Sequence, residues 1–382
     1  MSEFKKLVDN YENEKRQHEK YKNKDIEELM ILSNNNDLVA QVELAIKYKE
    51  GKDVEKNYEK TVEWLTKAAN QGYAIAQHEL GYCYDYGRGV TRDYKKAAEL
   101  YKKAAEQGYA NAQNSLGYCY ALGKGVKYSY KEAIEWYTKA INQGYASAQF
   151  NLGICYEFGM GVDKNYEEAV KWYSKAANQG HPASQYCLGI CYDIGQGVEQ
   201  DYKKAVEWYT KSANQGYPDA QNSLGHCYKY GEGVEQDYEK AVEWYRKAAE
   251  QGLESSQFSL GICYDIGQGV EQDYTKAVEW YSKSANQGYS KAQCNLGACY
   301  EDGQGVEKNY EKAVEWYSKA AAQGEATAQF NLGKCYETGK GIDQDYTKAI
   351  ELYNEAANQG YEKAKSSLDL LYKAGHGIEQ SD

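Results

Sequence analysis

Arginine is scarce in this chain of 382 residues, and acidic side chains outnumber basic ones. Only four arginines occur, and the formal net charge is −12. Nucleic-acid binding needs clustered Lys and Arg to contact phosphates, and base recognition relies on bidentate Arg. We therefore expect no nucleic-acid partner.

Long apolar runs are missing as well. The stretch "LMIL" at 29–32 is among the longest, whereas a membrane-spanning helix needs about 20 apolar residues. The first twenty residues, "MSEFKKLVDNYENEKRQHEK", contain no apolar segment of the kind found in secretory signals. The sequence therefore predicts a soluble, acidic, cytoplasmic protein with no membrane insertion.

Sequence patterns of catalysis and metal binding are also lacking. The five histidines are scattered without a metal-ligand spacing, and no Gly-x-Ser-x-Gly, phosphate-binding glycine loop or paired-carboxylate signature occurs. The glycine-rich "GQGVEQ" follows a predicted helix and recurs along the chain, which is typical of a turn. We expect no catalytic residue, no metal and no cofactor.

What the chain does contain is a repeat. The stretch "LGICYDIGQGVEQDY" occurs at 188–202 and again at 260–274, with a near copy at 224–238. Its leucine recurs from Leu44 to Leu368 at a constant interval of 36 residues. A fixed period of this length is typical of repeat arrays, in which each unit buries its apolar face only by stacking on its neighbours.

Each unit predicts two helices. Counting from the repeat leucine as position 0, Ala at −4, Cys at +3 and Tyr at +4 fall on one face of a first helix, which Gly at +7 ends. A second helix follows, with Val, Trp, Tyr and Ala on its apolar side and Gly at +28 after its end. Its first residue is preceded in every unit by a residue type that caps helix N-termini. These nine residues are Asn57, Asp93, Ser129, Asn165, Asp201, Asp237, Asp273, Asn309 and Asp345.

The pattern predicts an all-α solenoid of αα-hairpins in three segments. Residues 37–360 form nine repeats of 36 residues, and residues 361–382 form a C-terminal capping half repeat and tail. Residues 1–36 are expected to contain a charged N-terminal helix and a capping helix, and the charged segment is either a docking helix or partly disordered.

Cysteine follows the same period. Eight of the ten cysteines are Cys83, Cys119, Cys155, Cys191, Cys227, Cys263, Cys299 and Cys335. Equivalent positions of stacked units lie roughly 10 Å apart, too far for a disulfide or a shared zinc ion. We expect small buried hydrophobic side chains and ten free thiols. Cys187 and Cys191 could share a soft metal, but further ligands are missing.

The repeat pattern "AQxxLGxCYxxGxGVxxDYxKAxxWYxKAAxQGY" resembles the Sel1-like repeat, a relative of the tetratricopeptide repeat. The resemblance covers residues 37–378. It implies a right-handed superhelix whose first helices line a concave surface, and the role of an adaptor that binds peptides or assembles complexes. A secreted, cysteine-rich branch of that family is linked to β-lactam binding and hydrolysis. Its members carry paired cysteines within each repeat, whereas this chain has one.

Positions −2, +2 and +6 vary between units and lie opposite the repeat leucine on the first helix. Many of these residues are apolar, and exposed apolar patches usually mark interaction surfaces. We interpret them as partner-binding, with burial against the adjacent unit as the open alternative. The candidates are His78, Tyr82, Tyr86, Phe150, Ile154, Phe158, Tyr186, Ile190, Ile194, Tyr230, Phe258, Ile262 and Ile266.

Position +5 beside this stripe is mostly acidic, as at Asp193 and Asp265. An apolar surface edged with carboxylates should prefer a protein or peptide with hydrophobic anchors and basic residues. The sequence therefore predicts a non-catalytic adaptor that binds such a partner on the concave face of the solenoid. The alternatives are a β-lactam-binding hydrolase and a passive spacer.

Overall fold

The structure is a computed structural model that describes residues 19–376. These residues contain helices α2 to α21 and no strand, which confirms the all-α prediction. The charged helix predicted before residue 19 lies outside the described residues. Helix α2 (Ile26–Asn34) precedes the first hairpin, and α21 (Glu362–Lys373) follows the last.

The remaining helices form nine hairpins, each with a first and a second helix. The first helices are α3 (Leu38–Glu50), α5 (Ala74–Tyr86), α7 (Ala110–Leu122), α9 (Ala146–Phe158), α11 (Pro182–Ile194), α13 (Pro218–Tyr230), α15 (Glu254–Ile266), α17 (Ser290–Asp302) and α19 (Ala326–Thr338). The second helices are α4 (Tyr58–Asn70), α6 (Tyr94–Glu106), α8 (Tyr130–Ile141), α10 (Tyr166–Asn178), α12 (Tyr202–Asn214), α14 (Tyr238–Glu250), α16 (Tyr274–Asn286), α18 (Tyr310–Ala321) and α20 (Tyr346–Asn358).

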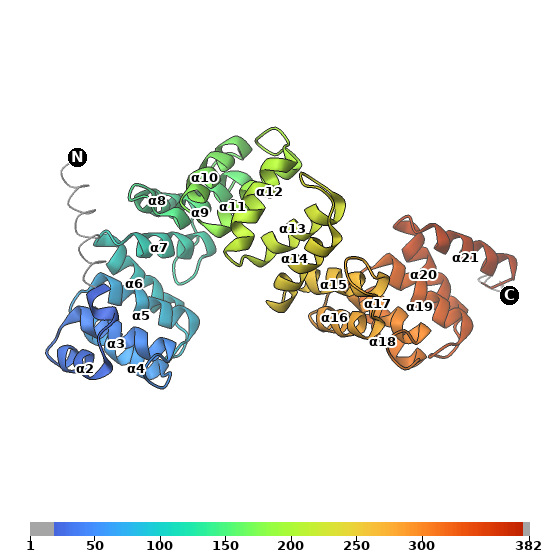
Figure 1. Ribbon diagram of the computed structural model, residues 1–382, viewed down its shortest axis with the longest axis horizontal. Coiled ribbons are helices and arrows are strands. Elements are labelled where there is room, and N and C mark those ends of the chain that lie inside the picture. The colour runs from blue at the N-terminus through green and yellow to red at the C-terminus, as the bar shows by residue number, and fades with distance from the viewer. Residues whose placement is uncertain (1–18, 377–382) are drawn as a thin grey trace. The chain divides into compact units, whose positions relative to one another are not determined.

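The chain folds as two compact units. The first comprises the described residues up to Cys191 together with Gly195–Glu199, and the second comprises Tyr192–Ile194 and the residues from Gln200 onward. Within each unit, helices that follow one another in the chain pack side by side (Figure 1). In the first unit α6 packs against α5 and α7, and in the second unit α14 packs against α13 and α15. This stacking is that of a repeat solenoid.

The predicted caps bound the helices. All nine cap residues of the second helices accept a hydrogen bond from the backbone three residues later; Asp237 Oδ1, for example, accepts from Lys240 N at 2.9 Å. Gly231 ends α13 with φ of 74°, a left-handed conformation that side chains disfavour. Gly233 serves another purpose, since a Cβ there would lie 2.2 Å from the Tyr202 carbonyl oxygen of the preceding hairpin. The two turn glycines thus end a helix and let two hairpins approach.

The glycine that follows the repeat leucine lies against a tyrosine of the second helix. A Cβ on Gly225 would be 2.6 Å from the Tyr245 ring, so only glycine fits without a shift of the ring. This tyrosine is among the largest fully buried side chains in six hairpins. The six are Tyr173, Tyr209, Tyr245, Tyr281, Tyr317 and Tyr353.

The tryptophans lie at the edge of the core rather than in it. All except Trp64 are half-buried, and a lysine ammonium covers each ring, as Lys283 Nζ does 3.9 Å from the Trp280 ring centroid. The apolar side that the sequence predicts for the second helix thus includes these tryptophans, but most of them are only partly buried. The neighbouring tyrosine lies in the core instead because it faces the glycine of the first helix.

Buried glutamines join successive hairpins. Gln221 Nε2 donates to the Ala213 carbonyl at the end of α12 across 3.1 Å, and its Oε1 accepts from Gln251 Nε2 after α14 at 2.8 Å. One amide thereby fixes three helix ends. The same two bonds recur in the pairs Gln77/Gln107, Gln113/Gln143, Gln257/Gln287 and Gln293/Gln323.

Candidate partner-binding surface

The candidates at position −2 are half-buried between helices. The Phe258 ring lies 5.9 Å from Tyr281 on its own second helix and 5.2 Å from Tyr289, which precedes the next first helix. Phe150 has the same kind of neighbours, with Tyr173 at 5.9 Å and His181 at 5.1 Å. These side chains pack between hairpins, as the alternative interpretation proposed. His78 and Tyr186 are likewise half-buried.

The candidates at position +2 are intermediate. Tyr82, Ile154, Ile190 and Ile262 are half-buried, and Ile262 packs against the core of its hairpin. Each lies one helical turn before the residue at +6, on the same side of the first helix. They can therefore support a contact made at +6 but present little surface of their own.

The residues at position +6 are exposed in six consecutive hairpins. In the first unit Tyr86, Leu122 and Phe158 expose 51, 49 and 64% of their surface. In the second unit the corresponding values are 58% for Ile194, 57% for Tyr230 and 57% for Ile266. We call these six residues the apolar ladder.

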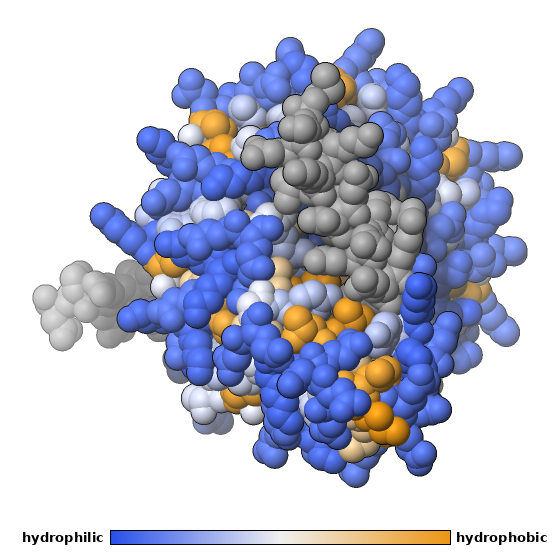
Figure 2. Space-filling view, turned by 90° about the vertical axis from the view of Figure 1, so that its left-hand side faces the viewer, coloured by the Kyte–Doolittle hydropathy of each residue, from blue (hydrophilic) through white to orange (hydrophobic). Residues whose placement is uncertain are grey.

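Two exposed residues of this face were not among the sequence-based candidates. Leu122 belongs to the apolar ladder, and Tyr118 lies one turn before it with 44% of its surface exposed. Both occupy the same repeat positions as the predicted residues, so comparing this unit with the others would have found them. The view onto the N-terminal end is mostly hydrophilic, with small apolar patches (Figure 2). Ile31 of α2, 63% exposed, is a further isolated apolar side chain.

The acidic side chains at position +5 bind the buried tyrosines. Tyr209 donates its hydroxyl hydrogen to Asp193 across 3.0 Å, and Tyr281 donates to Asp265 across 3.0 Å. The same bond joins Tyr173 to Glu157, Tyr317 to Glu301 and Tyr353 to Glu337. These carboxylates therefore satisfy a buried hydroxyl, a role that residue spacing along the chain did not predict.

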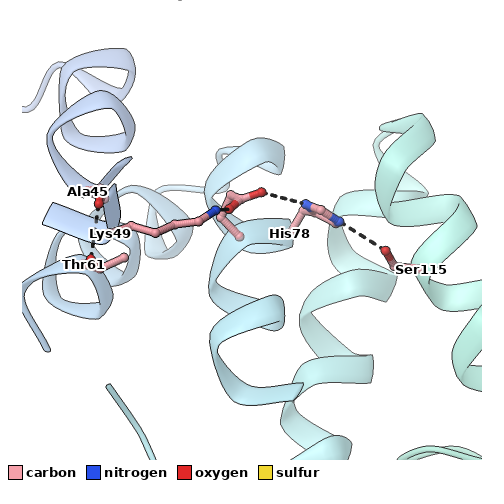
Figure 3. Close-up of polar contacts among 6 residues, drawn as sticks. Ala45, Lys49, Thr61, His78 and Ser115 are labelled. Atoms are coloured by element: carbon pink, nitrogen blue, oxygen red, sulfur yellow. Dashed lines mark hydrogen bonds and ion pairs between the residues drawn. The ribbon is translucent and has the colours of Figure 1, made fainter. Parts of the chain in front are cut away.

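One polar network links three first helices near the N-terminus (Figure 3). Lys49 Nζ lies 2.9 Å from Glu79 Oε2, His78 Nδ1 lies 3.4 Å from Glu79 Oε1, and His78 Nε2 lies 3.2 Å from Ser115 Oγ. Burial by itself would raise the pKa of Glu79. The contacts with His78 and Lys49 outweigh it and lower this pKa to about 2.

A serine, a histidine and a carboxylate in contact could suggest a nucleophile with its base. Ser115, however, lies within α7, where backbone N–H groups are used by the helix itself. The amides that flank Ser115 in the chain are thus not free to stabilise an oxyanion. His78 is moreover enclosed by the rings of Tyr101 and Tyr109 at 5.4 and 5.5 Å. The network joins three successive hairpins.

The cysteines behave as buried apolar side chains. All eight cysteines of the repeat series are buried, and burial raises the pKa of Cys263, for example, to about 11. None of the ten, all of which lie in the described part of the chain, forms a disulfide. Across residues 19–376, no group of three or more His, Cys, Asp or Glu is arranged to hold a metal ion. No helix in this range is both long and apolar enough to cross a membrane.

The hairpins coincide with a known repeat. Nine consecutive stretches match the family model of the Sel1 repeat, each 36 residues long, from 38–73 to 326–361. The chain belongs to the Sel1 repeat family. Sel1 repeat proteins are in general protein-interaction scaffolds, and the match indicates no catalytic family.

Two solved Sel1-type structures are similar over most of their length. A protective antigen present in uropathogenic Escherichia coli strains, which displays this fold, shares 37% identity, with 94% of this chain and 85% of that chain covered and a TM-score of 0.60. A Sel1 repeat protein from Oxalobacter formigenes shares 35% identity over 81% of this chain and 89% of its own, with a TM-score of 0.59. No curated protein matches the chain.

Proposed function

We propose that this Sel1 repeat protein is a non-catalytic scaffold that binds a protein or peptide partner along the apolar ladder. The observation that carries the proposal is the recurrence of an exposed apolar side chain at one position in six consecutive hairpins. The next two hairpins have Asp302 and Thr338 there, so the fold itself does not require an apolar residue. Covering these side chains with a partner would remove apolar surface from water.

The chemistry beside the ladder supports a partner that carries both apolar anchors and basic residues. Asp193 and Asp265 each use one carboxylate oxygen for a tyrosine hydroxyl, which leaves the other oxygen for a further donor. Both side chains are half-buried, so they reach the surface. The net charge of −12 would draw a basic partner toward the protein.

We also propose a cytoplasmic location. It is supported by ten cysteines of which none is in a disulfide, because thiols stay reduced in the cytosol and pair in oxidising compartments.

A photo-crosslinking experiment tests the proposed surface. A benzoylphenylalanine placed at position 158 or 266 should cross-link a partner in cells of the source organism. The same probe at Glu207 or Glu279, which are exposed on second helices, should not. Cross-linking that is equal at all four positions would contradict the proposal.

A further inference from the structure

Not every hairpin carries the carboxylate that binds the buried tyrosine, because position +5 is Ala121 in the hairpin of α7 and α8 and Lys229 in that of α13 and α14. In five hairpins the tyrosine hydroxyl donates to an Asp or Glu at position +5 of the first helix. In the hairpin of α13 and α14 this position holds Lys229, and the tyrosine is Tyr245. A lysine ammonium has only hydrogens to donate, so it cannot replace the lost acceptor.

The consequence is a buried hydroxyl without a partner. Tyr245 has none of its surface exposed, and its hydroxyl makes no hydrogen bond. Leaving a buried donor unsatisfied costs roughly 1–3 kcal/mol, and such groups are rare in native proteins. The hairpin nevertheless keeps the tyrosine rather than a phenylalanine of the same shape, and this choice calls for an acceptor from outside the chain.

Three side chains of α13 surround this part of Tyr245. His226 packs edge-on against the Tyr245 ring at 5.3 Å, and Tyr230 of the apolar ladder is 57% exposed. Lys229 is half-buried, and its Nζ lies 5.2 Å from the Tyr230 ring centroid, whereas no ion pair joins it to an acidic group of the described residues. In the neighbouring hairpins a half-buried Asp at +5 reaches the tyrosine hydroxyl from this side. Only the side chain at position +5 therefore separates the Tyr245 hydroxyl from the surface on this side.

We propose that a carboxylate of the partner binds here, accepting a hydrogen bond from Tyr245 and pairing with Lys229. The partner thereby supplies the group that five other hairpins carry themselves. A carboxylate fits because Asp and Glu occupy the same place in five hairpins, and its bonds to both groups are charge-assisted or ionic. This inference rests on the proposed function and adds one acidic residue, or a chain terminus, to a partner that is otherwise apolar and basic.

The surrounding charges make the site selective rather than strongly attractive. Asp193 and Glu232 act on nearby Cys227, so two other carboxylates are close. The negative charge of Asp193 is partly offset by its bond to Tyr209. These two carboxylates repel an approaching anion, so binding depends on direct contact with Tyr245 and Lys229.

Short peptides test the site without knowledge of the natural partner. The full chain is titrated with acetyl-Leu-Glu-Leu-amide, with the Gln analogue, and with acetyl-Leu-Leu bearing either a free carboxylate or an amide at its end. Saturation-transfer NMR gives each dissociation constant. We expect about tenfold tighter binding of one carboxylate peptide than of its neutral counterpart, the ratio that one charged hydrogen bond provides. The peptide that shows the preference identifies a side-chain or a terminal carboxylate as the ligand.

Three variants assign the preference to this hairpin. Lys229→Asp restores a resident carboxylate and should abolish the preference while raising the melting temperature. Tyr245→Phe should abolish it without lowering the melting temperature. Lys203→Asp, a charge reversal at an exposed lysine of α12, should keep it. Equal binding of all four peptides, or a preference that survives in Lys229→Asp, would overturn the inference. Neither result affects the cross-linking test of the apolar ladder.

Discussion

Replacing one buried tyrosine with phenylalanine should have opposite effects in two neighbouring hairpins. Tyr281→Phe removes a hydroxyl that donates to Asp265 across 3.0 Å and leaves that half-buried carboxylate without its donor. A hydrogen bond to a charged group contributes about 1.5–3 kcal/mol, and partial exposure of Asp265 reduces this to about 1–2 kcal/mol. Tyr245→Phe removes a hydroxyl that binds nothing, so the stability should stay the same or rise by up to about 1 kcal/mol.

Urea unfolding followed by circular dichroism measures this difference. Both substitutions remove one hydroxyl group from a fully buried ring. The free energy of unfolding should therefore fall with urea concentration at the same slope in both variants. The predicted gap between their free energies of unfolding is about 1–3 kcal/mol, with Tyr281→Phe the less stable. Equal losses in both variants would show that the tyrosine–carboxylate bond does not stabilise the hairpins.

Three further predictions concern the core, the stability at low pH and the thiols. Tyr281→Ala should lower the free energy of unfolding by about 3–5 kcal/mol, and the neighbouring Trp280→Ala by less than half of that, because only the tyrosine is fully buried. Equal losses in urea titrations would show that the tryptophan is a core residue as well. Glu79, with its lowered pKa of about 2, contributes stability that is present above about pH 4.5 and is lost as the pH falls toward 2. Glu79→Gln should lower the free energy of unfolding by about 2–3 kcal/mol at pH 7 and make the melting temperature depend less on pH over that range. An unchanged loss of stability at low pH would contradict the pairing of Glu79 with Lys49 and His78. In native protein a thiol reagent should modify half-buried Cys187 first and the buried cysteines only after denaturation, and mass spectrometry that finds several prompt modifications would refute their burial.

The sequence predicted the hairpins because their signals are local. Cap residues such as Asp237 and helix-ending glycines such as Gly231 act within a few residues, and the period sets the rest. Which of two adjacent aromatic residues fills the core could not be read from spacing, since Trp280 and Tyr281 fall on the same broad apolar side of one helix. The choice depends on a glycine twenty residues earlier, Gly261, against which the tyrosine ring lies.

The candidate surface was only partly predictable. The sequence placed positions −2, +2 and +6 on one side of the first helix, but the packing of the next hairpin buries part of that side. Phe258 is covered by Tyr289, whereas Ile266, two turns later, is beyond its reach and stays exposed. The role of Asp265 was missed because its partner, Tyr281, lies on another helix. The glutamine bonds between hairpins, such as Gln251 to Gln221, were missed for the same reason.

The most direct test of the account is the affinity for a cross-linked partner after the apolar ladder is made polar. The triple variant Phe158→Ser, Tyr230→Ser and Ile266→Ser should keep its helicity and melting temperature, because all three side chains are more than half exposed. Its affinity, measured by calorimetry with the purified partner, should fall at least about a hundredfold, since each interface anchor contributes about 1–2 kcal/mol.

The matched control replaces three exposed second-helix glutamates, one in each of three consecutive hairpins. It combines Glu207→Ser, Glu243→Ser and Glu279→Ser and should bind the partner within about twofold of the native chain, since rim charges contribute little. If the ladder variant folds normally and binds as tightly as this control, the apolar ladder is not the binding surface and the central claim is wrong.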